Sequence, residues 1–291
     1  MVQFIQQVIN GLSLGSIYAL IALGYTMIYG IMNLINFAHC DVLMIGAYVG
    51  LFGSSMGLGF IPSTLMAIIV CSILGVVIEK VAYRPLRNAE RITLLITAIG
   101  VSFLLEYVMM YFMGANVRNY PEGFFGFGTI HFHSLALASD KLLAAAVTVV
   151  LMIILQFIIK KTKIGKSIRA VSSDQDAAQL MGISVDNAIS LTFFIGSALA
   201  AVAGVMYGAI FTANPLMGMT PGIKAFVAAV FGGIGSIPGA ITGGVLLGFI
   251  ETMVGGYISS AYKDAAAFII LIIVLIVKPS GLLGKKTSEK V

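Results

Sequence analysis

Long apolar runs separated by short polar junctions dominate the chain. A helix that spans a membrane needs about 20 mostly apolar residues, because each residue adds about 1.5 Å toward a hydrocarbon core of about 30 Å. Runs that meet or approach this length lie at 4–30, 42–54, 62–79, 92–113, 141–159, 188–211, 222–256 and 261–277. The pattern predicts an all-α, polytopic helical membrane protein, with about 8 transmembrane segments in a single domain, 1–291.

The composition agrees with a membrane protein. Of the 291 residues, 59% are hydrophobic and only 10% are charged, whereas a soluble domain carries about 25% charged residues. The net charge of +5 does not indicate a nucleic-acid partner, because the basic residues sit at the ends of apolar runs. Cys40 and Cys71 lie in or beside apolar runs and suggest no disulfide framework. The first residues lack the positive charge of a signal peptide, so we expect them to be retained.

Lysine and arginine residues assign the two sides of the membrane. Three segments hold 13 of the 17 basic residues: the junction 80–91, the loop 160–187 and the tail 278–291. Because cytoplasmic loops are enriched in these residues, we expect all three segments, and therefore the C-terminus, to be cytoplasmic. Three crossings before the first junction place the N-terminus outside, and 114–140 becomes an outer loop. The remaining basic residues, expected on the outer side, are Arg118, Lys141, Lys224 and Lys263.

The number of crossings between the loop 160–187 and the tail must be even, yet only three apolar runs lie there. The run 222–256 is the exception, because 35 residues in one helix would measure about 52 Å. Its centre, "FGGIGSIPGAITGG", contains Pro238 and six glycines, which disfavour an unbroken helix. We therefore predict two short or half-membrane helices that meet at a break.

Non-helical backbone at membrane depth survives only where it is buried in protein or faces a water-filled cavity. The break in 222–256 is therefore a candidate for part of a translocation path. The residues of interest in this run are Gly232, Gly233, Ser236 and Glu251. A tight kink between two ordinary spans remains the alternative.

A similar polar interruption separates the first two apolar runs. Its polar side chains are Asn33, Asn36, His39 and Asp41. Counting crossings back from the junction 80–91 places this interruption near the cytoplasmic face. We expect these residues either to be solvated at the interface or to line the mouth of the path.

Few residues could support catalysis, and no catalytic residue is predicted. Asp41, Glu106 and Glu251 lie in or near apolar runs, where a carboxylate can serve a proton relay; capping or a hydrogen bond to a neighbouring helix explains each as well. His131 and His133 form an isolated His-x-His pair without a clear carboxylate or Cys partner, which is a weak metal signal. We therefore predict no metal site and no cofactor bound by this chain.

The loop 160–187 contains the letters "GKS" at 165–167, which resemble the end of a nucleotide-binding loop. Such a loop needs a glycine five residues before the Gly-Lys pair, because its backbone must curl around the phosphates. Lys160 occupies that position, and an apolar helix rather than a strand precedes it. If the protein uses ATP, another chain hydrolyses it.

The same loop contains a short helix signal, "SDQDAAQLMG", from Ser173 to Gly182. Two aspartates fall in the predicted first turn, good helix formers follow, and a glycine provides the C-terminal stop. The apolar pair near the end of this helix could fit a groove on a soluble partner. The residues predicted to contact such a partner are Asp174, Asp176, Ala177, Ala178, Leu180, Met181 and Gly182.

Several motifs resemble one family across almost the whole chain. The Asp-Ala-Ala run at 176–178, with glycine at 182, resembles the "EAA…G" loop through which permeases of ATP-binding-cassette (ABC) importers contact their ATPases, with aspartate in place of glutamate. The longer matching segments are "NGLSLGSIYALIALGYTMIYGIMNLINFAHCD" (10–41), "EKVAYRPLR" (79–87), "TAIGVSF" (97–103), "GSALAAVAGVMYG" (196–208), "GIKAFVAAVFGGIGSIPGAITGGVLLGFIE" (222–251) and "YKDAAAFIILIIVLIVKPSGLLG" (262–284). They resemble the first-type permease subunit of bacterial branched-chain amino-acid ABC importers, although Cys40 replaces the usual glycine of "NFAHG".

The resemblance implies a heteromeric importer in the bacterial cytoplasmic membrane. Its expected partners are a second homologous permease, two cytoplasmic ATPases that use ATP and Mg, an extracytoplasmic solute-binding protein and membrane lipid. The implied substrates are leucine, isoleucine and valine. An ion-coupled secondary transporter and an ABC permease for urea or short amides remain the alternatives.

Overall fold

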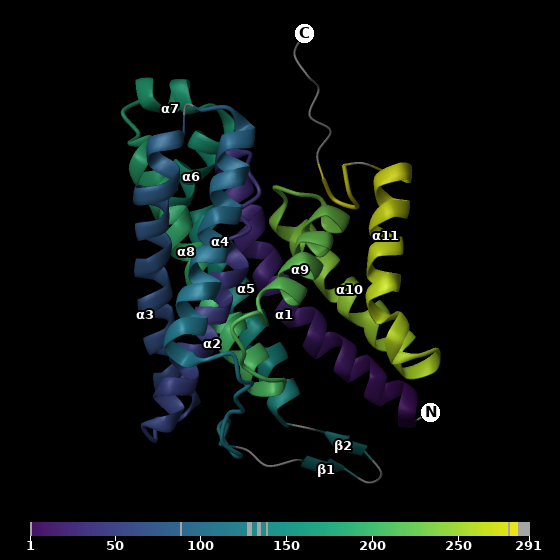
Figure 1. Cartoon of the computed structure of the whole chain (residues 1–291). Coiled ribbons are helices and arrows are strands. Elements are labelled where there is room, and N and C mark those ends of the chain that lie inside the picture. The colour runs from purple at the N-terminus through teal and green to yellow at the C-terminus, as the bar shows by residue number, and fades with distance from the viewer. Residues whose placement is uncertain are drawn as a thin grey trace.

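A computed structural model describes residues 2–87, 89–126, 130–132, 135–137, 139–278 and 280–284. Nearly all of the described elements are helices (Figure 1). The α-helices are α1 (Val2–Met32), α2 (His39–Ser55), α3 (Phe60–Ile78), α4 (Arg91–Met113), α5 (Ser139–Lys161), α6 (Lys163–Ser173), α7 (Gln175–Leu180), α8 (Val185–Ile210), α9 (Met219–Gly232), α10 (Ile237–Tyr257) and α11 (Lys263–Val277). Shorter elements are the π-helical turn Glu79–Tyr83, the 3₁₀ turns Arg84–Leu86 and Ser260–Tyr262, and strands β1 (Ile130–Phe132) and β2 (Leu135–Leu137).

Seven helices among the described residues are long and apolar enough to cross a membrane. α11 reaches this length together with the 3₁₀ turn before it, as Ser260–Val277. α2 and α9 are shorter, with 17 and 14 residues, so they measure about 25 and 21 Å. These lengths confirm a polytopic helical membrane protein with broken helices. The small antiparallel β1–β2 hairpin is an element that the sequence did not suggest.

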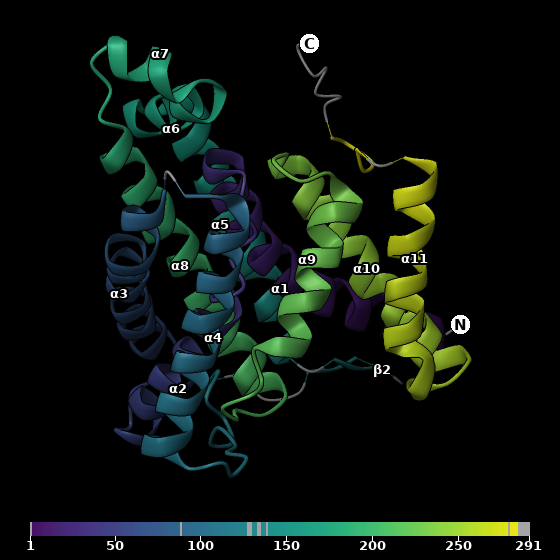
Figure 2. The same ribbon diagram turned by 45° about the horizontal axis from the view of Figure 1, so that its top comes forward.

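The helices form two groups around α1 (Figures 1 and 2). α1 runs diagonally through the middle, with α2, α3, α4 and α8 on one side and α9, α10 and α11 on the other. α6 and α7 lie at one end of the molecule, called here the α7 end. The β1–β2 hairpin and the N-terminal end of α1 lie at the opposite end, the β1–β2 end. α1 contacts α10, α8, α5 and α9 and therefore holds the two groups together.

Small residues allow the central helices to approach closely. Gly11, Gly15 and Ala19, spaced by four on α1, meet α10, where a side chain at Gly244 would come within 2.5 Å of the Ala19 backbone. On α8, Gly204 faces the backbone of Leu43 in α2. Close contact of this kind is the usual way that membrane helices pack.

The segment after α4 folds back onto the helix ends. The backbone groups of Arg118 and Ala213 exchange two hydrogen bonds of 2.8 and 2.9 Å. The Tyr120 hydroxyl donates to the carbonyl of Ala47 at 2.5 Å, and burial raises the pKa of Tyr120 above its usual range. His131 lies in β1, whereas His133 is outside the described residues.

Four helices, α8 to α11, lie between α7 and the tail. Three of them are long enough to cross a membrane, and α9 is shorter. α9 and α10 form an antiparallel hairpin, since Gly232 meets Gly239 and Gly243 meets the carbonyl of Ala228. The run 222–256 is therefore two helices that meet at a break, as predicted: α9 has 14 residues, and α10, with 21, is long enough to cross a membrane.

Candidate translocation path and coupling surface

Backbone conformation and backbone contacts shape the break between α9 and α10. Gly233 and Gly235 have φ angles of +111° and +84°, which L side chains rarely adopt. Ser236 caps α10, because its Oγ accepts a hydrogen bond from the Gly239 N–H at 3.2 Å. Gly232 packs directly against Gly239. Gly232, Gly233 and Ser236 therefore have clear structural roles in the turn.

The C-terminal segment closes this break. The Leu282 and Leu283 N–H groups donate to the carbonyls of Phe231 and Gly232 at 2.9 and 2.8 Å. These bonds satisfy carbonyl groups that the end of a helix leaves without partners. The sequence placed 278–291 in a cytoplasmic tail, but its residues 280–284 belong to the packed structure.

The break between α1 and α2 is built from side chains instead. Asn33 is exposed and has a φ angle of +52°. Asn36 is buried, and its Oδ1 accepts a hydrogen bond from the Tyr83 hydroxyl at 2.6 Å. His39 is 1% exposed and lies edge-on to Tyr25, with 5.0 Å between ring centroids. The predicted path residues of this segment therefore point to different surroundings rather than to one pocket.

The two breaks nevertheless meet at one narrow crevice of about 10 Å³, about the volume that holds one water. Ile35 comes from the first break and Ile234 from the second. Tyr25, Tyr29 and Phe226 supply most of the remaining wall. In this conformation the crevice is closed to any substrate larger than water.

Cys40 fits beside this crevice because α9 carries a glycine there. Its Sγ lies 2.5 Å from the Tyr25 hydroxyl, and a side chain at Gly222 would collide with it. The departure from the family motif therefore places a buried thiol between α1, α2 and α9.

The three intramembrane acids lie in two separate places. Asp41 accepts a hydrogen bond from Ser102 of α4 at 2.5 Å, and Glu106 follows one helical turn later on α4. Both carboxyl groups are buried. Glu251 lies on α10, in a different contact network.

Glu251 forms a buried ion pair that sequence reasoning missed. Its Oε1 lies 2.7 Å from Lys224 Nζ, and its Oε2 accepts from the Tyr18 hydroxyl at 2.9 Å. Lys224 also contacts Asp264 at 2.7 Å. Lys224 was expected on the outer side as one of the remaining basic residues, but it lies inside α9, 6% exposed. The pair ties α9 to α10 and explains Glu251 without a proton relay.

α7 has the caps that its sequence predicts. Asp174 Oδ1 accepts from the Ala177 N–H at 2.9 Å. At the other end, Gly182 has a φ angle of +79°, and the Gly182 and Ile183 N–H groups donate to the carbonyls of Gln179 and Ala178. This pattern is a Schellman motif, which stops the helix.

Two large apolar side chains are exposed at the C-terminal end of α7. Leu180 is 88% exposed and Met181 is 82% exposed. Ala178, by contrast, is buried against its own chain. Asp176, Ala177 and Gly182 are exposed beside the apolar pair. The likeness to a partner-docking helix therefore rests on Leu180 and Met181.

Hydrogen bonds connect the α6–α7 segment to the end of α1. Ser172 donates to the Gly30 carbonyl, and Gln175 Nε2 donates to the Ile31 carbonyl at 3.1 Å. These carbonyls directly precede the first break. A movement of α7 would therefore act on the backbone beside Asn33.

An ionic network connects the same region to α8. Glu79 is fully buried in the π-helical turn and lies 3.0 Å from Arg87 and 3.3 Å from Arg84. Ser190 of α8 donates to Glu79 at 2.6 Å, and Asp186 contacts both arginines. The turn continues into Tyr83, so this network borders the first break too.

Two segments have the letters of known sequence motifs, but neither has the local structure that its motif requires. "GKS" lies inside α6, where Gly165 donates to the Thr162 side chain that caps the helix. The run 11–15, "GLSLG", has the letters of a hydrolase serine elbow, but it lies within continuous α1 instead of a strand–turn–helix. The described residues contain no group of three or more His, Cys, Asp or Glu residues that could hold a metal ion.

Comparisons with known proteins agree with this arrangement. Residues 7–275 match the family described as branched-chain amino acid transport system, permease component. The chain is 44% identical to the high-affinity branched-chain amino acid transport system permease protein LivH of Salmonella typhimurium, over 99% of this chain and 98% of the relative. It is also 44% identical to the permease protein BraD of Pseudomonas aeruginosa, with the same coverage.

A solved structure supports the fold alone. It is an inward-facing transporter assigned to the metal-chelate type of ABC transporter. It matches 94% of this chain and 87% of its own length, with a TM-score of 0.53 and 15% sequence identity. The family match and the near full-length similarity lead to one conclusion: the chain belongs to the permease-component family of branched-chain amino acid transport systems.

Proposed function

We propose that this chain is the membrane-spanning permease subunit of an ATP-driven importer of branched-chain amino acids. Its relatives at 44% identity, matched over nearly their whole length, are named high-affinity branched-chain amino acid transport system permease proteins. The structural observation that carries the proposal is α7, which presents Leu180 and Met181 to solvent and is bonded to the end of α1. A permease that receives energy from another chain needs such an exposed contact surface.

The remaining subunits follow from this role. A second homologous permease completes the path, two ATPases dock at α7 and use ATP and Mg, and a solute-binding protein delivers leucine, isoleucine or valine. This chain then binds no cofactor of its own. The complex lies in the bacterial cytoplasmic membrane, with the α7 end and the C-terminus in the cytoplasm and the N-terminus outside.

In this mechanism, closure of the ATPase dimer moves α7. Gln175 and Ser172 pass the movement to the end of α1, and the Glu79 network passes it to α3 and α8. The crevice between the two breaks then opens. Such coupling requires contacts that differ between the two states, and bonds that cross from α7 to α1 are suited to that role.

The test introduces a charge at the apolar pair. Leu180→Glu and Met181→Glu should each reduce co-purification of the ATPases and abolish ATP-driven leucine uptake in proteoliposomes, because a charge opposes burial in a docking groove. Met56→Glu is the matched control: Met56 is 64% exposed and lies just past α2 toward the β1–β2 end. It should retain the ATPases. Normal uptake by both α7 variants would contradict the assignment.

An ion-coupled carrier is the rival function. It predicts uptake driven by a pH gradient in liposomes without ATPases, and loss of that uptake in Glu106→Gln. The proposed permease shows no such uptake in the wild-type chain. The Lys224 contact of Glu251 favours the permease, since it explains that carboxylate structurally.

A further inference from the structure

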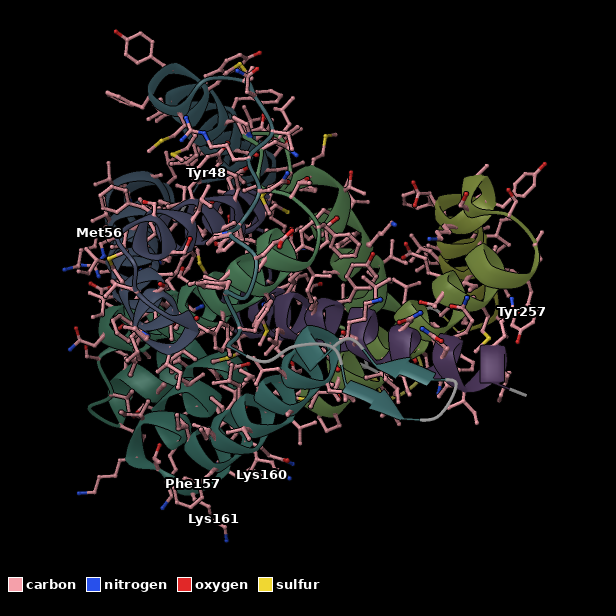
Figure 3. The ribbon with its side chains drawn as sticks, turned by 90° about the horizontal axis from the view of Figure 1, so that it is seen from below. Tyr48, Met56, Phe157, Lys160, Lys161 and Tyr257 are labelled. Carbon is pink, nitrogen blue, oxygen red and sulfur yellow. The ribbon has the colours of Figure 1, made fainter. Side chains whose placement is uncertain are left out.

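A cavity of about 350 Å³ opens at the β1–β2 end, where α1, α5, α8, α10 and the start of α11 come together. Its volume lies within the range of about 300–1,000 Å³ that is typical of small-molecule sites. Figure 3 looks onto this end, where Tyr257 at the end of α10 lies near the N-terminal part of α1. The polar lining residues are Gln7, Asn10, Ser13, Lys141, Thr252 and Lys263.

Two cations are among the described residues that line this cavity. Lys141 comes from α5 and Lys263 from α11, and no Asp or Glu is among the described lining residues. Lys141 Nζ donates to Asn10 Oδ1 at 3.0 Å, which holds the ammonium group at the cavity wall. A recess lined by cations, with protein rather than water around it, attracts anionic groups.

The positions of Lys263 and Gln7 depend on two adjacent glycines of α10. A side chain at Gly255 would collide with the Lys263 stem, and one at Gly256 would collide with Gln7 Nε2. Lys263 and Gln7 therefore lie flat across α10 at positions that only glycine leaves open. This packing fixes where the Lys263 side chain runs.

Part of the lining is apolar. Leu14 and Ile17 of α1 and Ile210 of α8 belong to it, and Ile17 is 1% exposed. Ser13 of α1, which is buried, also lines the cavity. The cavity thus combines cations with branched aliphatic side chains.

We propose that this cavity is an entry site for the free substrate, an α-amino acid with a branched aliphatic side chain. Lys263 and Lys141 bind the carboxylate, Leu14, Ile17 and Ile210 contact the aliphatic side chain, and Ser13 accepts from the ammonium group. The inference rests on the proposed import of branched-chain amino acids and adds a substrate site within this chain, apart from the crevice at the two breaks.

The test measures equilibrium binding of radiolabelled leucine to the complete nucleotide-free complex in phosphatidylcholine nanodiscs, without the solute-binding protein. Lys263→Gln should weaken binding about tenfold, because a hydrogen bond to a charged group is lost, and Lys263→Arg should restore part of it. Leucinamide, which lacks the carboxylate, should compete poorly with leucine for the wild-type complex, and its disadvantage should be smaller for Lys263→Gln, which keeps only Lys141 for the carboxylate.

Lys80→Gln is the matched control, since Lys80 is exposed at the other end of the molecule. ATP-driven leucine uptake by the wild-type complex is measured alongside. If that uptake is present, either of two results would overturn the proposal: unchanged leucine binding in both Lys263→Gln and Lys141→Gln, or no leucine binding by the wild-type complex. Failure of the wild-type complex to import any branched-chain amino acid would instead reject the proposed function. A lipid phosphate is another anion that could occupy the cavity, and nanodiscs that contain phosphatidylglycerol test for it. Loss of leucine binding in these nanodiscs would assign the cavity to a lipid phosphate and would also overturn the proposal.

Discussion

The two breaks in the helical bundle are held in different ways. Between α1 and α2, buried side chains make the contacts: Tyr83 bonds to Asn36, and Gln175 bonds to the carbonyl of Ile31. Between α9 and α10, glycines and backbone hydrogen bonds from Leu282 and Leu283 make them. The first break is hydrogen-bonded to the α6–α7 segment, whereas the second is closed by backbone contacts. One bundle thus interrupts its helices in two ways, through side chains and through backbone.

The largest expected effect tests the rigidity of the α9–α10 hairpin. Lys224→Met should destabilise the protein by about 3–5 kcal/mol, because it leaves the buried Glu251 carboxylate without its cation. Thermal unfolding of the purified chain measures the change. Adding Glu251→Gln should recover most of the loss, since the uncompensated charge is removed. A Lys224→Met protein as stable as the wild type would show that the hairpin does not need the pair.

A second change tests the turn itself. Gly233→Ala should cost about 3 kcal/mol, because the residue combines a φ angle of +111° with a side-chain carbon only 2.7 Å from the Gly284 Cα. Gly235→Ala is the matched control, with a φ angle of +84° and no neighbour within 4 Å. It should cost about 1–2 kcal/mol. Equal losses in Tm would mean that contact with the C-terminal segment contributes nothing.

A substitution at the first break should reduce stability less than the changes at the second break, but it should affect transport more. Tyr83→Phe removes the 2.6 Å hydrogen bond to Asn36 and leaves a buried acceptor without its donor, at about 1–3 kcal/mol. We expect fewer substrate molecules imported per ATP hydrolysed, measured in proteoliposomes of the whole complex. If Tyr83→Phe lowers Tm but leaves that ratio unchanged, the first break is as passive as the second.

The smallest effect is expected at the link from α7 to α1. Gln175→Ala removes one hydrogen bond to the Ile31 carbonyl, which contributes about 0.5–1.5 kcal/mol. The import-to-ATP ratio should fall while the ATPases stay bound. Gln179→Ala, the same substitution at an exposed position of α7, should leave the ratio unchanged. Identical ratios in both variants would exclude this hydrogen bond from coupling.

Features with local causes could be predicted from the sequence. The break in 222–256 follows from its glycines and proline, and the caps of α7 follow from Asp174 and Gly182, because backbone conformation at these positions depends on nearby residues.

Contacts between distant segments could not be predicted. Lys224 was counted as a marker of the outer side, since nothing near it in the sequence shows that Glu251 will face it. Tyr83 and Leu282 looked like ordinary residues of a junction and a tail. Their partners are set by how the helices pack, which the apolar pattern leaves open.

The hydrogen bonds from Leu282 and Leu283 to the end of α9 also have a consequence for biosynthesis. Translation proceeds from the N-terminus, and folding follows it, so Leu282 and Leu283, which close the second break, are made after α10 and α11. The end of α9 therefore enters the membrane with its carbonyls unpaired, and the turn is completed only once α11 has been made. Until then, an insertase or chaperone would meet an unfinished turn.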